Sequence, residues 1–197
     1  MISIDKTSFV EYIEAVIKHY PLEINGILVE SRDCFLVKGI SYLSQEEIDI
    51  INREYDNDFV FGLTYDISKK QCIGTTIPIE NTRKNLRELI ENKKIVRGIL
   101  HGHTWQERAP ESCLYLGTLI NRLVYSLKKP PMKKPELSGN DIKKFDEIIK
   151  SYSKQPIYYG ILNVPNPLDV RVILRELDKR LLFFEEGKVL TGYTIKE

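Results

Sequence analysis

The sequence predicts an α+β fold in a single domain over residues 1–197, and three observations support this. The chain has 197 residues, which is enough for one hydrophobic core and too few for two of ordinary size. Apolar residues recur at helical spacing in some segments and form short strand-like runs in others. Several of these runs are separated by short turns, so the strands should fold back on one another, which favours α+β over a doubly wound sheet.

The composition is that of a chain that can bury a core, with 42% hydrophobic and 29% charged residues. The 29 Lys and Arg residues balance 28 Asp and Glu residues, so no overall field attracts nucleic acid or an anionic membrane. No apolar run approaches the roughly 18 residues of a membrane span, and the N-terminus lacks the pattern of a signal peptide. We therefore expect a cytoplasmic protein without nucleic-acid or membrane partners. Its three cysteines form no CxxC pair and are interpreted as reduced thiols.

The N-terminal part of the chain predicts one helix followed by two paired strands. Ser8 and Glu11 have the spacing of a capping box, and Pro21 ends the helix. The apolar stripe of this helix consists of Phe9, Ile13, Val16, Ile17 and Tyr20. Residues 24–31 and 34–43 are rich in Ile, Leu, Val and Phe and flank a Ser-Arg-Asp turn, so they predict a hairpin.

The middle of the chain alternates between helix and strand signals. Residues 45–54 favour a short helix, and residues 58–67 favour a strand followed by a Ser-Lys-Lys-Gln turn. The pattern at 72–79 is ambiguous. Residues 81–92 predict a charged helix that presents Leu86, Leu89 and Ile90, and residues 95–103 predict an apolar strand that ends in histidines.

The C-terminal half predicts two helices and then several strands. A helix with a long apolar stripe is expected at 111–127, an extended lysine- and proline-rich connection at 128–135, and a second helix at 138–152. The strand-like stretches that follow are 156–164, 168–176, 180–185 and 188–195.

The candidate chemistry begins with His101-Gly102-His103 at the end of the predicted strand 95–103. Residues two apart on a strand project from the same face, so both imidazoles can reach one ion without distorting the backbone. A His-x-His pair also occurs without any metal, so the interpretation depends on further ligands.

Two acidic residues, Asp141 and Glu23, are candidates for the third metal ligand and the general base that the histidine pair lacks. Ser138 and Asp141 stand at the start of a predicted helix, a spacing that also fits an ordinary helix cap. An Asp in that first turn would complete a catalytic zinc site that keeps its fourth position for water. Glu23 begins an otherwise apolar strand, where a carboxylate is either solvated at the edge or placed as a general base.

Taken together, these motifs resemble the signature of the JAMM (MPN+, Mov34/JAB) zinc metalloproteases, in the order of that family. The matching motifs are Pro21-x-Glu23-x-x-Gly26-x-Leu28, His101-x-His103 and Ser138-x-x-Asp141. The order of helices and strands is also similar over residues 5–165. The resemblance implies a single JAMM-like domain, in which a curved mixed β-sheet is flanked by helices in a layering like that of cytidine deaminases.

The resemblance also implies an activity and a role for each residue. One Zn²⁺ per chain would be held by His101, His103 and Asp141, and an amide bond would be cleaved at the C-terminus of ubiquitin or a ubiquitin-like protein. Glu23 would accept the proton of the attacking water and return it to the departing amine. Ser138 would donate a hydrogen bond to the tetrahedral oxyanion.

Two other residues near these motifs have weaker signals. Trp105 follows the histidines by two positions and either contacts substrate or forms the wall of the site. His19 lies in the first helix and is interpreted as structural.

The chain departs from the family pattern at two places. Thr104 stands where the family has Pro after the second histidine. Residues 104–137 replace the short spacer of the family, so we interpret them as an insertion. An alternative alignment uses Pro110-Glu111-Ser112, but it puts Tyr115 in the position of the metal-binding Asp and predicts a pseudoenzyme. The long insertion is preferred because it supplies both Ser and Asp at the correct spacing.

Two other functions stay open at this level. The domain could be a catalytically silent MPN-like scaffold that mediates assembly, or a zinc hydrolase acting on a free peptide or small molecule, because fold and metal site do not determine substrate. The sequence gives no oligomeric state.

Overall fold

The computed structural model describes residues 1–20, 22–44, 46–47, 49–50, 63–66, 71–75, 79–104, 135, 143, 147–149, 157–164, 168–185, 188–190 and 192–197, with the backbone alone at 63–66 and 71–75. The elements in chain order are β1 (Ile2–Asp5), α1 (Lys6–Lys18), β2 (Asn25–Glu30), β3 (Phe35–Ser41), β4 (Leu63–Asp66), β5 (Gln71–Thr75), α3 (Ile79–Glu91), β6 (Val96–His103), β7 (Tyr158–Asn163), α6 (Val170–Arg175), α7 (Leu177–Arg180), β8 (Leu181–Glu185), β9 (Lys188–Val189) and β10 (Tyr193–Lys196).

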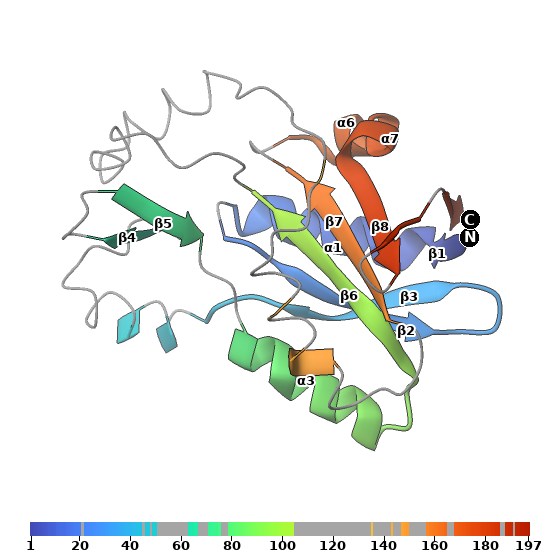
Figure 1. The fold of residues 1–197 in the computed structure, drawn as a ribbon, viewed down its shortest axis with the longest axis horizontal. Helices are drawn as coiled ribbons and strands as arrows, with labels where there is room; N and C mark the ends of the chain where they lie inside the picture. Colours follow the sequence, from blue (N-terminus) through green and yellow to red (C-terminus); the bar gives the residue numbers. More distant parts are fainter. Residues whose placement is uncertain are drawn as a thin grey trace.

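The main sheet is mixed and curved, with helices on both faces (Figure 1). Its eight strands run in the order β10-β1-β3-β2-β6-β7-β8-β9, and β4 and β5 form a separate pair. Parallel pairs are β10–β1, β1–β3 and β6–β7, whereas the other neighbours are antiparallel. Both chain ends lie at one side of the molecule because β1 and β10 pair. The predicted α+β class is confirmed.

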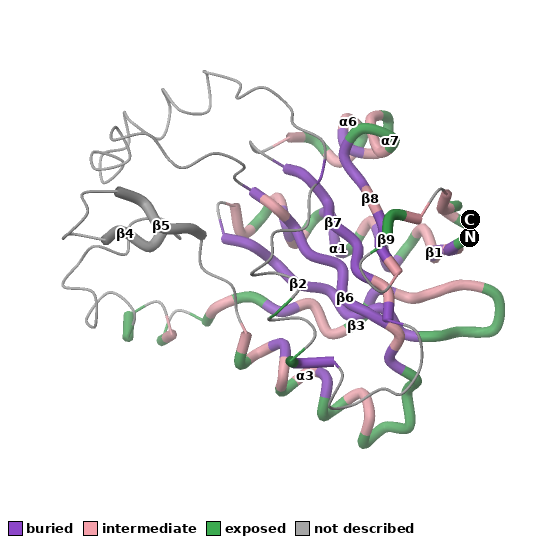
Figure 2. The backbone as a smooth tube through the Cα atoms, viewed as in Figure 1, coloured by how far each residue is buried: buried purple, intermediate pink, exposed green. Residues whose placement is uncertain are grey.

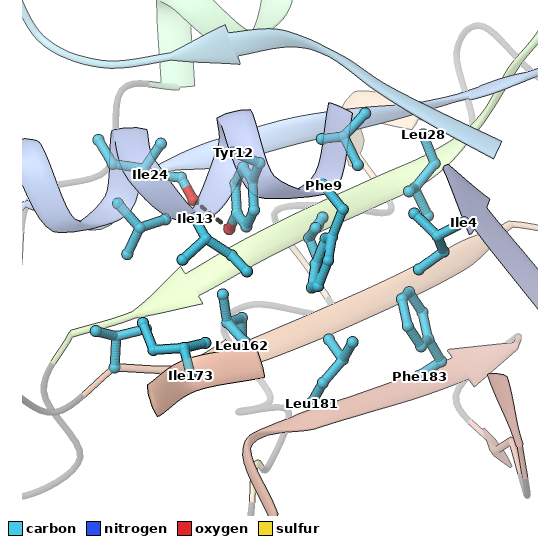
Figure 3. Packing of buried hydrophobic residues seen from close by; sticks show 14 of the residues in the cluster. Ile4, Phe9, Tyr12, Ile13, Ile24, Leu28, Leu162, Ile173, Leu181 and Phe183 are labelled. Carbon is cyan, nitrogen blue, oxygen red and sulfur yellow. Dashed lines mark hydrogen bonds between the residues drawn. The ribbon is translucent and has the colours of Figure 1, made fainter. Parts of the chain in front are cut away.

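Each face of the central sheet carries its own buried layer. The strand residues alternate between faces, as the period of two requires, so Leu28 packs beneath α1 while Ile27 and Val29 pack toward α3. Figure 2 shows the buried residues concentrated in the central strands. In the first layer, α1 and α6 cover β2, β6, β7 and β8 through Phe9, Tyr12, Ile13, Leu28, Leu162, Ile173, Leu181 and Phe183 (Figure 3). In the second layer, Leu86 of α3 packs with Ile99 of β6 and with Ile148.

Helix α1 begins earlier than its sequence predicts. The side chain of Asp5 accepts a hydrogen bond from the Ser8 backbone N–H at 2.8 Å, so Asp5 is the N-cap and Ser8 lies inside the first turn. Ser8 has a different task, because its hydroxyl accepts from the Val37 backbone N–H at 3.0 Å and joins α1 to β3. The capping box at Ser8 was therefore wrong, although the helix itself is confirmed.

The prediction of a strand at 168–176 was also wrong, because these residues form α6. The run is rich in β-branched residues, but Val170, Ile173 and Leu174 recur at helical spacing and pack on the first buried layer. Asp169 caps the helix by accepting from the Arg171 backbone N–H at 2.7 Å. The N-cap at Asp169 and the apolar stripe of the helix together outweigh the β propensity of the individual residues.

Other elements agree with the sequence in kind and differ at their ends. The hairpin of β2 and β3, helix α3, and strands β6, β7 and β8 are confirmed. Helical residues occur at 46–47 and 49–50, within the helix expected at 45–54. The predicted strand 188–195 is two strands, β9 and β10, separated by residues 190–192. Strand β1 and helix α7 were not predicted.

Several predictions fall outside the described residues. These are the helix at 111–127, nearly all of the lysine- and proline-rich connection at 128–135, and most of the helix at 138–152, of which residues 143 and 147–149 are described and helical. Within the described part of the chain, no helix is both long and apolar enough to cross a membrane.

Candidate metal centre

The two histidines of the motif lie at the end of β6 and share one face of the sheet. Their rings meet edge to face, with centroids 4.7 Å apart and planes at 87°. The His101 side chain is buried, with 0% of its surface exposed, while His103 at the strand end is partly exposed. Gly102 faces the opposite side, where a Cβ atom would lie 3.0 Å from Val16 Cγ2 of α1. The histidine pair thus emerges from a strand that α1 supports closely from behind.

Glu23 is held beside this pair by the continuation of the β2–β6 ladder. Asn25 pairs with His101, and one step further the Gly102 N–H donates to the Ile24 carbonyl at 2.9 Å. The Tyr12 hydroxyl donates to the same carbonyl at 3.0 Å, as the dashed line in Figure 3 shows. Carrying this register one residue further places Glu23 opposite His103, on the face of both imidazoles.

The hydroxyl of Tyr12 is suited to this task because it stays protonated. Burial raises the pKa of Tyr12 well above its ordinary value, and the negative charge of Glu23 raises that pKa further. The phenol therefore remains a hydrogen-bond donor at neutral pH, and it fixes the backbone immediately after Glu23.

The side chains of Glu23, His101 and His103 converge on one point. Their candidate ligand atoms, a carboxylate oxygen and two ring nitrogens, all lie within 4.8 Å of one another. Glu23 Oε2 is 3.4 Å from His101 Nε2, and Glu23 is 8% exposed. Imidazole nitrogen and carboxylate oxygen are the donors that suit a divalent transition metal such as zinc. The group fits a metal ion by its chemistry and its spacing.

Sequence reasoning missed two buried polar residues behind His101. Asn25 Oδ1 lies 2.8 Å from His101 Nδ1, and Asn25 Nδ2 donates to Thr82 Oγ1 of α3 at 3.0 Å. All three side chains are fully buried. The available signal was Asn25 itself, a polar residue on the same strand face as Glu23 in an apolar segment. Thr82 gave no signal that distinguishes it from a helix-surface residue.

The remaining predicted site residues lie outside the described part of the chain. These are Ser138, Asp141 and Trp105, and the segment 110–115 of the alternative alignment lies outside it as well. The third protein ligand, the oxyanion donor and the substrate contact therefore stay predictions, as do the catalytic roles of the described residues.

The third histidine of the chain lies apart from this group and has a structural contact. His19 follows α1 and stacks on Tyr42, with ring centroids 4.3 Å apart and planes at 12°. Partial burial lowers the pKa of His19, and the positive charge of Lys18 lowers it further. The neutral ring is therefore favoured, consistent with an aromatic stacking role.

Comparison with known proteins gives similarity of structure only. No family model matches the sequence, and no curated protein matches it. A protein from Desulfitobacterium hafniense, solved in solution, is 14% identical with a TM-score of 0.45, over 100% of this chain and 94% of the other. A JAB1/MPN domain protein from Archaeoglobus fulgidus is 11% identical with a TM-score of 0.42, over 99% of this chain and 100% of the other. The assignment of a metal centre therefore rests on the residues of this chain alone.

Proposed function

We propose that the protein is a zinc-dependent hydrolase that cleaves an amide bond, with ubiquitin-like proteins or their conjugates as substrates. The observation that carries the proposal is the convergence of Glu23, His101 and His103 within 4.8 Å. Two separate segments of the sequence meet there, since Glu23 precedes β2 while both histidines lie at the end of β6. The motif order Glu, His-x-His, Ser-x-x-Asp supports a peptidase or isopeptidase over other zinc hydrolases.

In this proposal His101 and His103 hold the zinc, with Asp141 as the third protein ligand. Zinc bound there supplies a Lewis acid, which polarises the scissile carbonyl and makes water a stronger nucleophile at neutral pH. Glu23 is reserved for proton transfer because catalytic zinc sites use three protein ligands and leave one position open.

The proton movements fall to Glu23. Its carboxylate accepts a proton from the water as the new C–O bond forms, and then donates that proton to the amine nitrogen as the C–N bond breaks. Its low exposure of 8% keeps the carboxylate out of bulk water and close to the histidines. Ser138, in its proposed role, donates to the oxyanion that develops on the carbonyl oxygen.

The experiment is an assay of zinc-loaded protein against ubiquitin-like proteins that carry C-terminal extensions. We expect cleavage at the junction, loss of cleavage after chelation, and recovery when zinc is restored. Glu23→Gln should retain zinc and the fold while kcat falls by about a hundredfold or more, because it removes a base and no ligand.

Four outcomes would contradict parts of the proposal. Undiminished turnover by Glu23→Gln would place the base elsewhere, and loss of zinc from that variant would make Glu23 a ligand. Full zinc occupancy without turnover on any extended protein or free peptide would favour the silent scaffold. Cleavage confined to free peptides would retain the hydrolase and exclude the ubiquitin-like substrate.

A further inference from the structure

We propose that Asn25 is a positioning residue that selects the Nδ1–H tautomer of His101, so that Nε2 is the ring nitrogen presented to the metal. Thr82 of α3 takes part by holding the Asn25 amide in the required orientation. The tautomer follows from the described contacts alone, whereas its importance for metal binding depends on the proposed function.

The register of β2 and β6 brings Asn25 beside His101. Asn25 and His101 are paired residues of neighbouring antiparallel strands, so their side chains project from the same face at close range. Both are 0% exposed, so neither side chain is in contact with bulk water. The 2.8 Å between Asn25 Oδ1 and His101 Nδ1 is a full hydrogen bond.

The donor and acceptor groups of the Asn25 amide determine which nitrogen of the His101 ring carries the proton. A carboxamide oxygen only accepts and its NH₂ group only donates. In the structure Asn25 Nδ2 donates to Thr82 Oγ1 at 3.0 Å, and Oδ1 is the atom that faces His101. His101 Nδ1 must then carry the proton. The opposite amide orientation would require a proton on Nε2, which would prevent that nitrogen from binding a metal.

Glu23 Oε2 and Asn25 Oδ1 are acceptors that lie near different nitrogens of the His101 ring. Glu23 Oε2 lies 3.4 Å from Nε2, beyond the usual range of N–H···O hydrogen bonds. Asn25 Oδ1 lies 2.8 Å from Nδ1, within that range. The shorter contact favours protonation of Nδ1. This arrangement also raises the electron-donating capacity of Nε2, as partners of metal-bound histidines do in general.

The test begins with the tautomer in metal-free protein, measured by long-range ¹H–¹⁵N correlation of labelled histidines at about pH 8, where an ordinary histidine is neutral. We expect the Nδ1–H pattern for His101 in the natural protein and in Asn25→Asp, which keeps an acceptor oxygen. Asn25→Leu should shift His101 toward the Nε2–H pattern, and Thr82→Val should produce a smaller shift in the same direction. An Nε2–H pattern in the natural protein, or an unchanged pattern in Asn25→Leu, would overturn the proposal.

The second measurement is zinc affinity by competition with a chromophoric chelator. Asn25→Leu should weaken zinc binding by about 10- to 100-fold, the usual effect of removing such a partner, and Asn25→Asp should restore most of it. The matched control is Asn85→Leu. Asn85 also joins α3 to the sheet, but it does so at β3, through Gly39 O and Ser41 Oγ at 3.0 Å each. Equal losses of zinc affinity in Asn25→Leu and Asn85→Leu would show that Asn25 contributes only to packing.

The two measurements separate this proposal from the proposed function. If the natural protein cleaves no substrate yet shows the Asn25-dependent tautomer and zinc affinity, the positioning role stands and the peptidase activity fails. If Asn25→Leu does not fold, the natural protein still tests the tautomer, and Thr82→Val, which keeps Asn25, still tests its dependence on the amide orientation.

Discussion

Gly102 is the residue at which the metal centre and the fold constrain each other most closely. The side chains of its neighbours in the sequence, His101 and His103, face the site, whereas a side chain at position 102 would point toward α1. An added Cβ atom would lie 3.0 Å from Val16 Cγ2 and 3.1 Å from the Tyr12 hydroxyl oxygen. Only the absence of a side chain lets α1 approach the strand this closely.

Gly102→Ala should therefore destabilise the protein by about 1–3 kcal/mol, the usual range for overpacking a well-filled core. The measurement is the free energy of unfolding by chemical denaturation. Gly192→Ala is the matched control, because a Cβ atom at that position has nothing within 4 Å. If both variants unfold at the same denaturant concentration as the natural protein, the close packing of α1 on β6 is wrong.

At the scale of single elements, the start of α1 provides a second test. Asp5 both ends β1 and caps α1, so the helix that supports the site begins at one carboxylate. Asp5→Ala should cost about 1 kcal/mol of folding free energy, as the loss of an N-cap generally does, whereas Asp5→Asn should cost little. If Asp5→Ala is as stable as the natural protein, Asp5 does not cap the helix, and the N-cap at Ser8 that the sequence predicts is favoured.

The same scale shows which elements the sequence could predict. Strand β6 was predictable because its apolar run ends in a polar motif. Helix α3 was predictable because its sequence separates a charged face from an apolar one. Strand β1 was not predicted, because its four residues gain their partners only from β3 and from β10 at the other end of the chain. Helix α6 was misread because its β-branched residues masked a helical stripe that only tertiary packing completes.

The site was partly predictable for a similar reason. Residue chemistry and motif order singled out Glu23, His101 and His103, and the structure brings these three together. The support of His101 by Asn25 and Thr82 was not predictable, because it depends on the strand register and on where α3 crosses the sheet. The two contacts join residues that are 57 and 76 positions apart, so they leave no local pattern. Ser138 and Asp141 stay predictions.

At the scale of the whole molecule, the sheet order explains how distant segments form one centre. Strand β6 lies between β2 and β7, with antiparallel and parallel partners on its two sides. This central position buries His101 and brings the chain entering β2 beside both histidines. His103, the last residue of β6, is the partly exposed member of the pair.

The central claim is that this convergence is a metal centre, and metal content per chain tests it most directly. The chain has three histidines, so the third serves as an internal control. After loading with zinc and removal of excess metal, the natural protein and His19→Ala should each retain about one zinc per chain, while His101→Ala and His103→Ala should lose most of it. Stoichiometric zinc in both site variants, with their folds intact, would contradict the account.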